Sequence, residues 1–312
     1  MKRIFIWIGV VGAVATRGLV RAWDSYGHMS VAYVAYQSLT PQARNKADAL
    51  LKTNPDFNNW VKMMPAGSSQ SQKNLMAFMI AATWPDRIKS TPGYHEDNPA
   101  LGAQSLCSAV SLQNVGFSDH FRHRCWHFVD VAFTRDNSSL PATPVPNAEE
   151  RVGLFRPALS GTDDALKAYD LSWLLHLVGD LHQPLHCTTR IRQGVSDNGG
   201  NGTKVKVKVA AKPLHTYWDD LLGTGENVTK VIKSAKKLPA ADAMKALDLD
   251  VSHWVAEGVA LARTKIYATP VGKGAGPFKL TAKYKSNAKK IAQEQVALAG
   301  ERLANLLNAE LK

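Results

Sequence analysis

The sequence predicts a mainly α-helical protein: a single-domain helical bundle with long loops and one short β-hairpin. Apolar residues recur at helical spacing in several segments, and residues that favour helix starts precede some of them. We find no internal repeat and no convincing domain boundary. The 312 residues are 45% hydrophobic and 21% charged, which allows a sizeable core and excludes a collagen, a coiled-coil rod and a disordered polar chain.

Residues 1–22 have the pattern of a signal peptide. Lys2 and Arg3 precede the apolar run 4–15, which is too short to span a bilayer. Cleavage after Ala22 would make Trp23 the new N-terminus of a single domain, 23–312. It would also remove four basic residues and lower the net charge from +12 to +8. A short N-terminal anchor is the alternative, but we predict export, either to the periplasm or out of the cell.

The N-terminal third of the exported chain is predicted to be helical. Val31, Val34 and Ala35 fall at helical spacing. Thr40 and Pro41 are typical of an N-cap followed by a first-turn proline, and a third helix is predicted over 72–82. Residues 87–160 are rich in Pro, Gly, Ser and Asn, so we expect long loops packed on a helical body.

The second half of the chain predicts three further helices and one strand. Thr162, Asp163 and Asp164 supply an N-cap and an acidic first turn. The helix that they open continues through Val178. A Gly- and Asn-rich loop over 198–202 leads into 203–209, where Lys alternates with Val as in a strand. Helices are predicted over 241–266 and 288–311, and the Pro- and Gly-rich segment 269–277 joins them.

The chain has only three cysteines, which excludes a disulfide-dense scaffold. Cys107 and Cys125 are close enough in sequence to form a disulfide in an oxidising compartment. Cys187 is left over. It is either a buried thiol or a residue that disturbs its neighbour His186, and the sequence leaves both interpretations open.

The most informative stretch runs from His176 to His186. His176 and Asp180 lie four residues apart on a predicted helix, so their side chains project from one face. An imidazole and a carboxylate at this spacing can converge on one zinc ion. Pro184 should end the helix, which would let His186 turn back towards the same site.

Other candidate metal ligands lie outside this stretch. His215 and Asp219 repeat the four-residue spacing, and two such pairs are harder to explain as incidental than one. Asp86 ends a predicted helix, and His127 lies between apolar residues. The alternatives are an ordinary turn carboxylate for Asp86 and a hydrogen-bonded core histidine for His127.

The predicted new terminus adds two more candidates, Trp23 and His28. A freed α-amino group has a pKa near 8, so a neutral amine can bind metal at modest cost. Together these residues offer nitrogen and oxygen donors at nine positions, which suits several zinc ions and requires no thiolate.

The candidates occur in an ordered set of motifs. In order they are Trp23-x4-His28, Trp84-x-Asp86, His127-Phe128-x-Asp130, His176-x3-Asp180-x2-Gln183-Pro184-Leu185-His186, Gly199-Gly200-Asn201 and His215-x3-Asp219. The set resembles the trinuclear-zinc nucleases of fungi, plants and bacteria, the S1/P1 type, and the resemblance covers nearly all of the exported chain. Each motif is weak alone, whereas the ordered set is highly specific. The resemblance implies the helical architecture of zinc-dependent phospholipases C and nucleases.

The resemblance implies three zinc ions. The first would be bound by Asp86, His127, His176 and Asp180, the second by His186, His215 and Asp219, and the third by the Trp23 amino nitrogen and carbonyl oxygen, His28 and Asp180. Asp180 would thus bridge the first and third ions. About forty residues separate Asp86 from His127, a longer gap than the family pattern leads us to expect.

The resemblance further implies hydrolysis of phosphodiester bonds in single-stranded DNA and RNA to 5′-phosphate products, with 3′-nucleotides as additional substrates. A hydroxide bridging the first and third ions would attack phosphorus, since zinc lowers the pKa of bound water to about 7. The predicted catalytic residues are Asp86, Asp180 and Lys89. Lys89 would balance charge on the phosphate, and a solvated loop lysine is its alternative interpretation.

Three more residues match positions that bind substrate in the family. Phe128 would stack on an unpaired base, a contact worth about 1–3 kcal/mol, and Asp130 would accept from a base-edge amine. Asn201, with Lys89, would lie near the phosphate. A core aromatic remains the alternative for Phe128, and a plain turn explains Asn201 equally well.

Two other functions compete with a secreted single-strand nuclease. A zinc-dependent phospholipase C shares the architecture, although Asp219 and the Phe128 and Asp130 pair favour nucleotides. A basic binding protein with structural metals explains the charge but not the surplus of ligands. We expect a monomer without stable membrane association. Solvated charge is the preferred interpretation of two basic segments, His120 to Arg124 and the alternating Lys204, Lys206 and Lys208. The alternative is contact with a nucleic-acid strand, in which the three lysines would follow the phosphate backbone in a salt-dependent manner.

Overall fold

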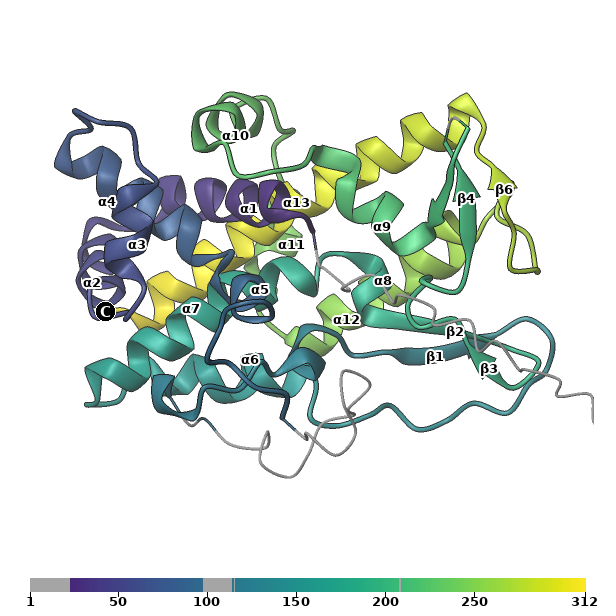
Figure 1. Cartoon of the computed structure of the whole chain (residues 1–312), viewed down its shortest axis with the longest axis horizontal. Helices are drawn as coiled ribbons and strands as arrows, with labels where there is room; N and C mark the ends of the chain where they lie inside the picture. The colour runs from purple at the N-terminus through teal and green to yellow at the C-terminus, as the bar shows by residue number, and fades with distance from the viewer. Residues whose placement is uncertain (1–22, 98–113, 115, 208) are drawn as a thin grey trace, which may run out of the picture.

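The computed structural model describes residues 23–97, 114, 116–207 and 209–312, and this part of the chain is mainly helical (Figure 1). The helices are α1 (Ser25–Ser38), α2 (Pro41–Leu51), α3 (Phe57–Lys62), α4 (Gln70–Ala81), α5 (Trp84–Ile88), α6 (Ala148–Ala158), α7 (Asp164–Asp180), α8 (Pro184–Cys187), α9 (Leu214–Asp219), α10 (Val228–Ala235), α11 (Ala243–Leu247), α12 (Val251–Leu261) and α13 (Ala282–Glu310). Short 3-10 turns are η3 (Phe117–Asp119), η4 (Arg124–His127) and η5 (Asp220–Leu222), and a π-helical turn, η6 (Ala262–Ile266), extends α12. The predicted fold class is confirmed.

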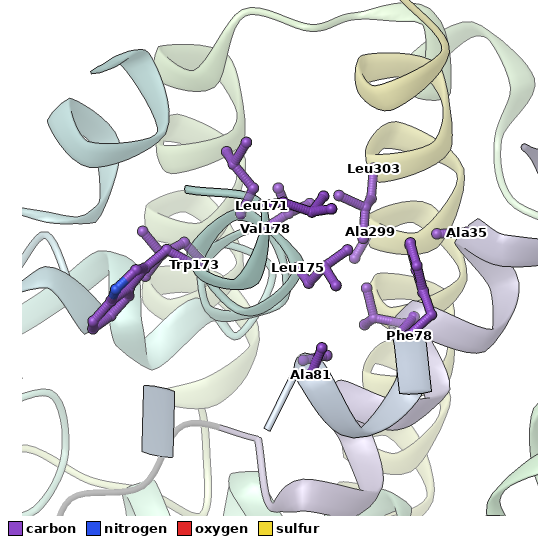
Figure 2. Close-up of a cluster of buried hydrophobic side chains, with 14 of the residues drawn as sticks. Ala35, Phe78, Ala81, Leu171, Trp173, Leu175, Val178, Ala299 and Leu303 are labelled. Atoms are coloured by element: carbon purple, nitrogen blue, oxygen red, sulfur yellow. The ribbon is translucent and has the colours of Figure 1, made fainter. Parts of the chain in front are cut away.

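Helix α7 forms the centre of the main hydrophobic cluster. Every residue from Ala168 to Asp180 is buried, as expected for a helix that other elements enclose on all sides. Figure 2 shows its apolar side chains gathered with those of α13 and α4, among them Leu171, Leu175, Val178, Ala299, Leu303, Phe78 and Ala81. The last two turns of α7, which include His176 and Asp180, are therefore fixed by packing on several helices.

Two three-stranded sheets lie at one end of the molecule (Figure 1). In the first, β2 (Thr188–Arg192) pairs in parallel with β1 (Val131–Thr134) and antiparallel with β3 (Val195–Ser196). In the second, β4 (Lys204–Lys206) pairs antiparallel with β5 (Ala211–Pro213) and in parallel with β6 (Phe278–Lys279). A second cluster of buried residues, including Val205, Leu214, Trp218 and Tyr267, lies in this region. The molecule thus has a larger β region than the one short hairpin that we predicted.

The predicted helix starts are largely confirmed. The Thr40 side chain accepts from the Ala43 amide, with Pro41 as the first residue of α2. Asp163 accepts from the two amides at positions 165 and 166 at the start of α7. Helix α4 begins two residues earlier than predicted, because Ser69 caps it and forms a capping box with Gln72.

Other predictions along the chain are wrong in detail. The expected loop region 87–160 contains α6, which Asn147 caps by accepting from the Glu150 amide. The helix predicted over 241–266 is interrupted, because Asp250 caps a new helix, α12, after α11 has ended at Leu247. Strand β4 is shorter than the predicted 203–209, and Lys208 lies outside the described residues. None of the helices in the described part of the chain combines the length and apolar character that crossing a bilayer requires.

Candidate metal centre

Asp180, the last residue of α7, lies at the centre of a buried cluster of histidines. Its Oδ2 atom is 3.1 Å from His127 Nδ1 and 3.2 Å from His176 Nε2. Its Oδ1 atom is 3.4 Å from His28 Nε2 and 3.8 Å from His186 Nδ1. One carboxylate with no exposed surface therefore contacts imidazoles from four separate elements.

Helix α1 brings His28 to this carboxylate. The His28 ring stacks on the His176 ring with centroids 3.8 Å apart. Gly179 makes this approach possible, because a Cβ at position 179 would lie 2.8 Å from His28 Nδ1. Together His28, His176 and Asp180 form one group whose donor atoms lie within 4.8 Å of one another.

A second group contains Asp86, His127 and His176. Asp86 lies in the first turn of α5, and His127 is the last residue of η4. The Asp86 Oδ1 atom is 3.8 Å from both His127 Nδ1 and His176 Nε2. The buried Lys89 side chain places its Nζ 2.6 Å from the same oxygen.

A third group contains His186, His215 and Asp219, on the short helices α8 and α9. The two Nε2 atoms of its histidines are 3.1 Å apart, and His215 Nε2 is 3.6 Å from Asp219 Oδ2. The buried Gln183 side chain donates to Asp219 Oδ1 at 2.7 Å. This group adjoins the other two, because His186 also lies beside Asp180.

Hydrogen bonds to main-chain carbonyls determine which nitrogen of three histidines carries the proton. His176 Nδ1 lies 2.7 Å from Ala82 O, His186 Nδ1 2.6 Å from His127 O and His215 Nδ1 2.7 Å from Gly199 O. A carbonyl only accepts, so each Nδ1 must donate and each neutral ring presents a lone pair at Nε2. The Nε2 lone pairs of His186 and His215 therefore face each other at 3.1 Å. Two acceptors at this distance repel each other unless a cation lies between them.

Other buried polar atoms of the centre also have no hydrogen-bond partner within the described residues. They are both ring nitrogens of His28, the Nε2 of His127 and the Oδ1 of Asp180. Buried polar atoms are rarely left in this state, because an unpaired group costs about 1–3 kcal/mol. Buried nitrogen and oxygen donors that converge without hydrogen-bond partners fit zinc or a similar divalent ion.

Burial keeps these histidines neutral. It lowers the pKa of His28 to about 3 and of His176 to about 4, and it places the pKa values of His127 and His186 well below their ordinary value. Burial also raises the pKa of Asp180 well above its ordinary value, so the carboxylate needs a nearby cation to stay ionised.

Asp86 differs from Asp180 because it has a resident cation. Burial disfavours the Asp86 carboxylate, but the neighbouring Lys89 ammonium outweighs burial, and the pKa lies below its ordinary value. Lys89 is therefore a buried member of the centre, unlike the solvated loop lysine that was its alternative interpretation.

The residues predicted to bind substrate lie close to these groups in the chain. Phe128 is half-buried and directly follows His127, whose carbonyl accepts from His186. Asp130 is also half-buried, with a φ of 59°, and burial together with Asp197 raises its pKa to about 7. The Asn201 side chain donates to Asn198 O within its own loop. The substrate-binding roles of these residues stay predictions.

A polar network that supports His215 was not predicted from the sequence. Asp197 Oδ1 accepts from the amides of Arg190 and Gly200, and Asp197 Oδ2 accepts from the hydroxyls of Thr203 and Tyr267. The network holds the Gly199–Gly200 turn, whose Gly199 carbonyl accepts from His215. Gly199 has a φ of 59°, and a Cβ there would lie 2.7 Å from Leu185 O. The only sequence signal was the Asp that precedes the Asn- and Gly-rich loop.

The basic segment His120 to Arg124 is not a solvated loop. His123 is fully buried between Asp97 and Asp119 and stacks on Trp126 with centroids 3.5 Å apart. Arg122 and Arg124 both pair with Glu96. Solvated charge was the wrong interpretation, because Glu96 and Asp97, more than 20 residues earlier in the sequence, and the adjacent Asp119 neutralise the segment.

The cysteine predictions have different outcomes. Cys187 is a free, buried thiol that donates to Leu181 O at 3.2 Å, and burial raises its pKa far above the ordinary value. Its Sγ atom lies against Gly258 of α12, where a Cβ would be 2.5 Å from it, which agrees with the buried-thiol interpretation. Cys107 lies outside the described residues, so its pairing with Cys125 stays a prediction.

Comparison with known proteins agrees with the motif set. Nuclease P1 of Penicillium citrinum is 26% identical to this chain over 199 residues, a match that covers 63% of this chain and 57% of that protein. Nuclease PA3 of a Penicillium species matches with the same identity and coverage. The match thus spans less than two thirds of the length of these relatives. The family model for S1/P1 Nuclease matches residues 23–312, nearly the whole chain, and the protein therefore belongs to the S1/P1 nuclease family.

Proposed function

We propose that this protein is a zinc-dependent nuclease that hydrolyses phosphodiester bonds in single-stranded DNA and RNA to 5′-phosphate products and also acts on 3′-nucleotides. The observation that carries the proposal is the set of three adjoining donor groups around Asp180, in one of which the Nε2 lone pairs of His186 and His215 face each other. Membership of the S1/P1 nuclease family and the names of the two similar proteins support nuclease activity.

Nine residues would hold three zinc ions. They are Asp86, His127, His176 and Asp180 for the first ion, His186, His215 and Asp219 for the second, and Trp23, His28 and Asp180 for the third. Bound zinc would supply Lewis-acid activation of water near neutral pH and stabilise negative charge on the reacting phosphate. Asp180 is suited to a bridging role because its two oxygens face different histidines.

The chain's own side chains would bind and orient the substrate. Lys89 places an ammonium 2.6 Å from Asp86, within the centre, where it would attract a phosphate oxygen. Phe128 keeps part of its ring accessible next to His127 and would stack on an unpaired base. Asp130 would accept a hydrogen bond from an amine on the edge of that base. Because duplex bases are already stacked on each other, such a pocket favours single strands.

We also propose that export and cleavage after Ala22 create the terminus that completes the third site. Trp23 is fully buried, and the amide of Asp24 donates to Asp219 O at 3.3 Å. The main chain at position 23 therefore lies beside the candidate ligands of α9. The match to the family begins at the same residue.

Metal analysis and a substrate panel test the proposal together. The exported protein should contain about three zinc ions per chain. It should hydrolyse denatured DNA, RNA and a 3′-nucleotide, lose these activities in chelator and leave phosphatidylcholine intact. A single bound ion would contradict the three-ion centre. Activity only on phosphatidylcholine would replace the nuclease with the phospholipase C alternative.

A pair of histidine variants tests whether activity depends on the candidate metal centre and not on a histidine elsewhere in the molecule. His176→Ala should abolish hydrolysis of denatured DNA, because His176 belongs to two donor groups. His253→Ala should retain it, since His253 is exposed and pairs with Asp248 and Asp250, which belong to none of the three donor groups. Retained activity in His176→Ala would refute the role that we propose for this residue.

A further inference from the structure

Basic residues are concentrated in two segments of the chain. Residues 198–218 and 258–293 contain twelve Lys and Arg residues and no Asp or Glu. The whole chain has a net charge of +12, so all other residues together carry no net charge. Without the four basic residues of the predicted signal peptide, that remainder is −4. The positive charge of the exported protein thus comes entirely from these two segments.

The fold brings the two segments together at one end of the molecule. The first supplies β4 and β5, and the second supplies β6 and the start of α13 (Figure 1). The Lys204 amide donates to Ala275 O at 2.7 Å, and Lys285 Nζ donates to Val207 O at 2.9 Å. Helices α2, α3 and α4 lie at the opposite end (Figure 1).

The lysines occupy the outer side of the second sheet and the surface beside it. Lys204 and Lys206 are exposed and alternate with Val205, which is fully buried. The register of β4 and β6 places Lys279 next to Lys206, on the same side of the sheet. Four further exposed lysines of the two segments are Lys265, Lys273, Lys283 and Lys289. We call these seven lysines together the basic face.

Few of these charges are neutralised within the described part of the chain. Lys212 pairs with Asp220, and Lys290 pairs with Glu294. The seven lysines of the basic face form no ion pair with a described carboxylate, so they repel one another. A surface of one sign attracts a polyanion, and the attraction depends on salt.

The basic face is continuous with the candidate metal centre. Strand β5 ends at Pro213, and α9, which contains His215 and Asp219, begins at the next residue. Before β4, the Gly199 carbonyl accepts from His215, and Lys204 Nζ donates to Asn201 O at 3.1 Å. The hairpin that carries Lys204 and Lys206 is thus connected at both ends to elements that contact His215.

We propose that the basic face binds the sugar-phosphate backbone of a single-stranded substrate beyond the linkage that is hydrolysed. This inference rests on the proposed nuclease function and specifies how a long strand is held. Its direct connection to α9 favours a strand that enters the metal centre over an anionic membrane surface. The charge would give long polymers an advantage over short ones without any contact to bases.

The test compares two triple variants of the zinc-loaded, exported protein. Lys204→Gln, Lys206→Gln and Lys279→Gln together remove charge from the basic face. Lys46→Gln, Lys52→Gln and Lys62→Gln remove the same charge from exposed positions at the other end. We expect the first variant to lower the ratio of kcat/KM for a 40-mer of deoxythymidine to kcat/KM for a dinucleotide by about tenfold. The second variant should keep the wild-type ratio.

Salt dependence provides a second readout. Each phosphate contact to a single strand contributes about −0.7 to the slope of log affinity against log salt, so loss of three contacts should make the slope about 2 less steep. Equal ratios and equal slopes in the two triple variants would overturn the proposal. So would a basic-face variant that loses only its binding to phosphatidylserine vesicles.

The wild type and the two triple variants also show whether a negative result contradicts this inference or the proposed nuclease function. If the wild type hydrolyses no nucleotide substrate, the nuclease proposal fails. Fluorescence anisotropy of a labelled 40-mer then decides whether the basic face binds a strand. Weaker binding in the basic-face variant alone supports the surface, and equal binding in both variants overturns it.

Discussion

The candidate metal centre joins two regions that are built in different ways. His28, His176 and Asp180 lie on long helices, α1 and α7, that pack in the main hydrophobic cluster. His215 and Asp219 lie on α9, a helix of six residues, next to the small sheets. The first region is held by apolar packing on all sides. The second depends on the turn at Gly199 and the polar network of Asp197.

This difference shows that donor atoms can be positioned by two kinds of support. Packing fixes the helical region because a close-packed core resists small displacements. In the β region, a chain of hydrogen bonds from Asp197 through Gly200 and Gly199 to His215 positions the donors instead. Outer partners of metal ligands commonly control affinity by 10–100-fold. The two regions should therefore respond differently to substitution.

The largest effect is expected from Asp180→Asn in the helical region. An amide retains the size of the side chain but cannot supply the charge that buried zinc ions require, and Asp180 contacts four imidazoles. Hydrolysis of denatured DNA should fall by at least about 10³-fold. Zinc content should fall by more than one ion per chain, measured by metal analysis. Unchanged zinc content would show that Asp180 does not bridge two sites.

A smaller and more local effect is expected from Asp197→Asn in the β region. The amide cannot accept all four of the hydrogen bonds made to Asp197, so the Gly199 turn and His215 should lose their fixed position. Zinc content should fall by one ion, and activity should fall about 10–100-fold. The control Asp250→Asn changes an exposed cap of α12 and should keep all zinc. Loss of every ion in Asp197→Asn would show that the two regions are not independent.

Sequence patterns predicted the helical region well because its signals are local. The four-residue spacing of His176 and Asp180, with Asp163 as the cap, requires only one helix to bring donors onto one face. Helix α6 was missed because its cap, Asn147, lies in a segment rich in Pro and Ser that resembles a loop. Helix α12 was joined to α11 because the capping role of Asp250 is weaker than the apolar pattern around it.

The β region was harder to predict because its contacts are distant in sequence. Asp197 is linked to Tyr267, 70 residues away, and β4 pairs with β6 across a similar separation. The spacing of residues along the sequence contains no information about pairs that lie so far apart. The burial of His123 escaped prediction for the same reason, since His123 depends on Asp97, 26 residues earlier. The ordered motif set indicated which residues matter, whereas only the structure shows which contacts hold them in position.

Two glycine variants test how tightly the helical region is packed. Gly300 of α13 faces α1, and a Cβ there would lie 2.4 Å from Val34 Cβ. Gly300→Ala should therefore lower the free energy of unfolding by about 1–3 kcal/mol. A Cβ at Gly153 of α6 would meet no atom within 4 Å, so Gly153→Ala should raise the free energy of unfolding by about 0.5–1 kcal/mol. Chemical denaturation measures both, and a stabilised Gly300→Ala protein would show that α1 and α13 can move apart.

The smallest effect concerns pH and the segment around His123, which packs beside the helical region. Burial disfavours the charged form of His123, but hydrogen bonds with Asp119 and Asp97 outweigh burial and raise its pKa above the ordinary value. A histidine whose pKa is raised by folding stabilises the folded state fully at pH values below its ordinary pKa of 6.5. This stabilisation is lost as the pH rises through the pKa that the histidine has in the folded protein. The stability difference between wild type and His123→Gln should therefore shrink by about 1 kcal/mol between pH 6 and pH 9.

The neighbouring residue His120 offers a matched control for this pH dependence. Its ring contacts Tyr94 rather than a carboxylate, and its φ of 54° suits asparagine. Urea denaturation of His120→Asn at pH 6 and pH 9 controls for the effect of pH on the rest of the molecule. A His123→Gln difference that does not change between these two pH values would mean that His123 stays neutral and supports its segment through its stacking on Trp126.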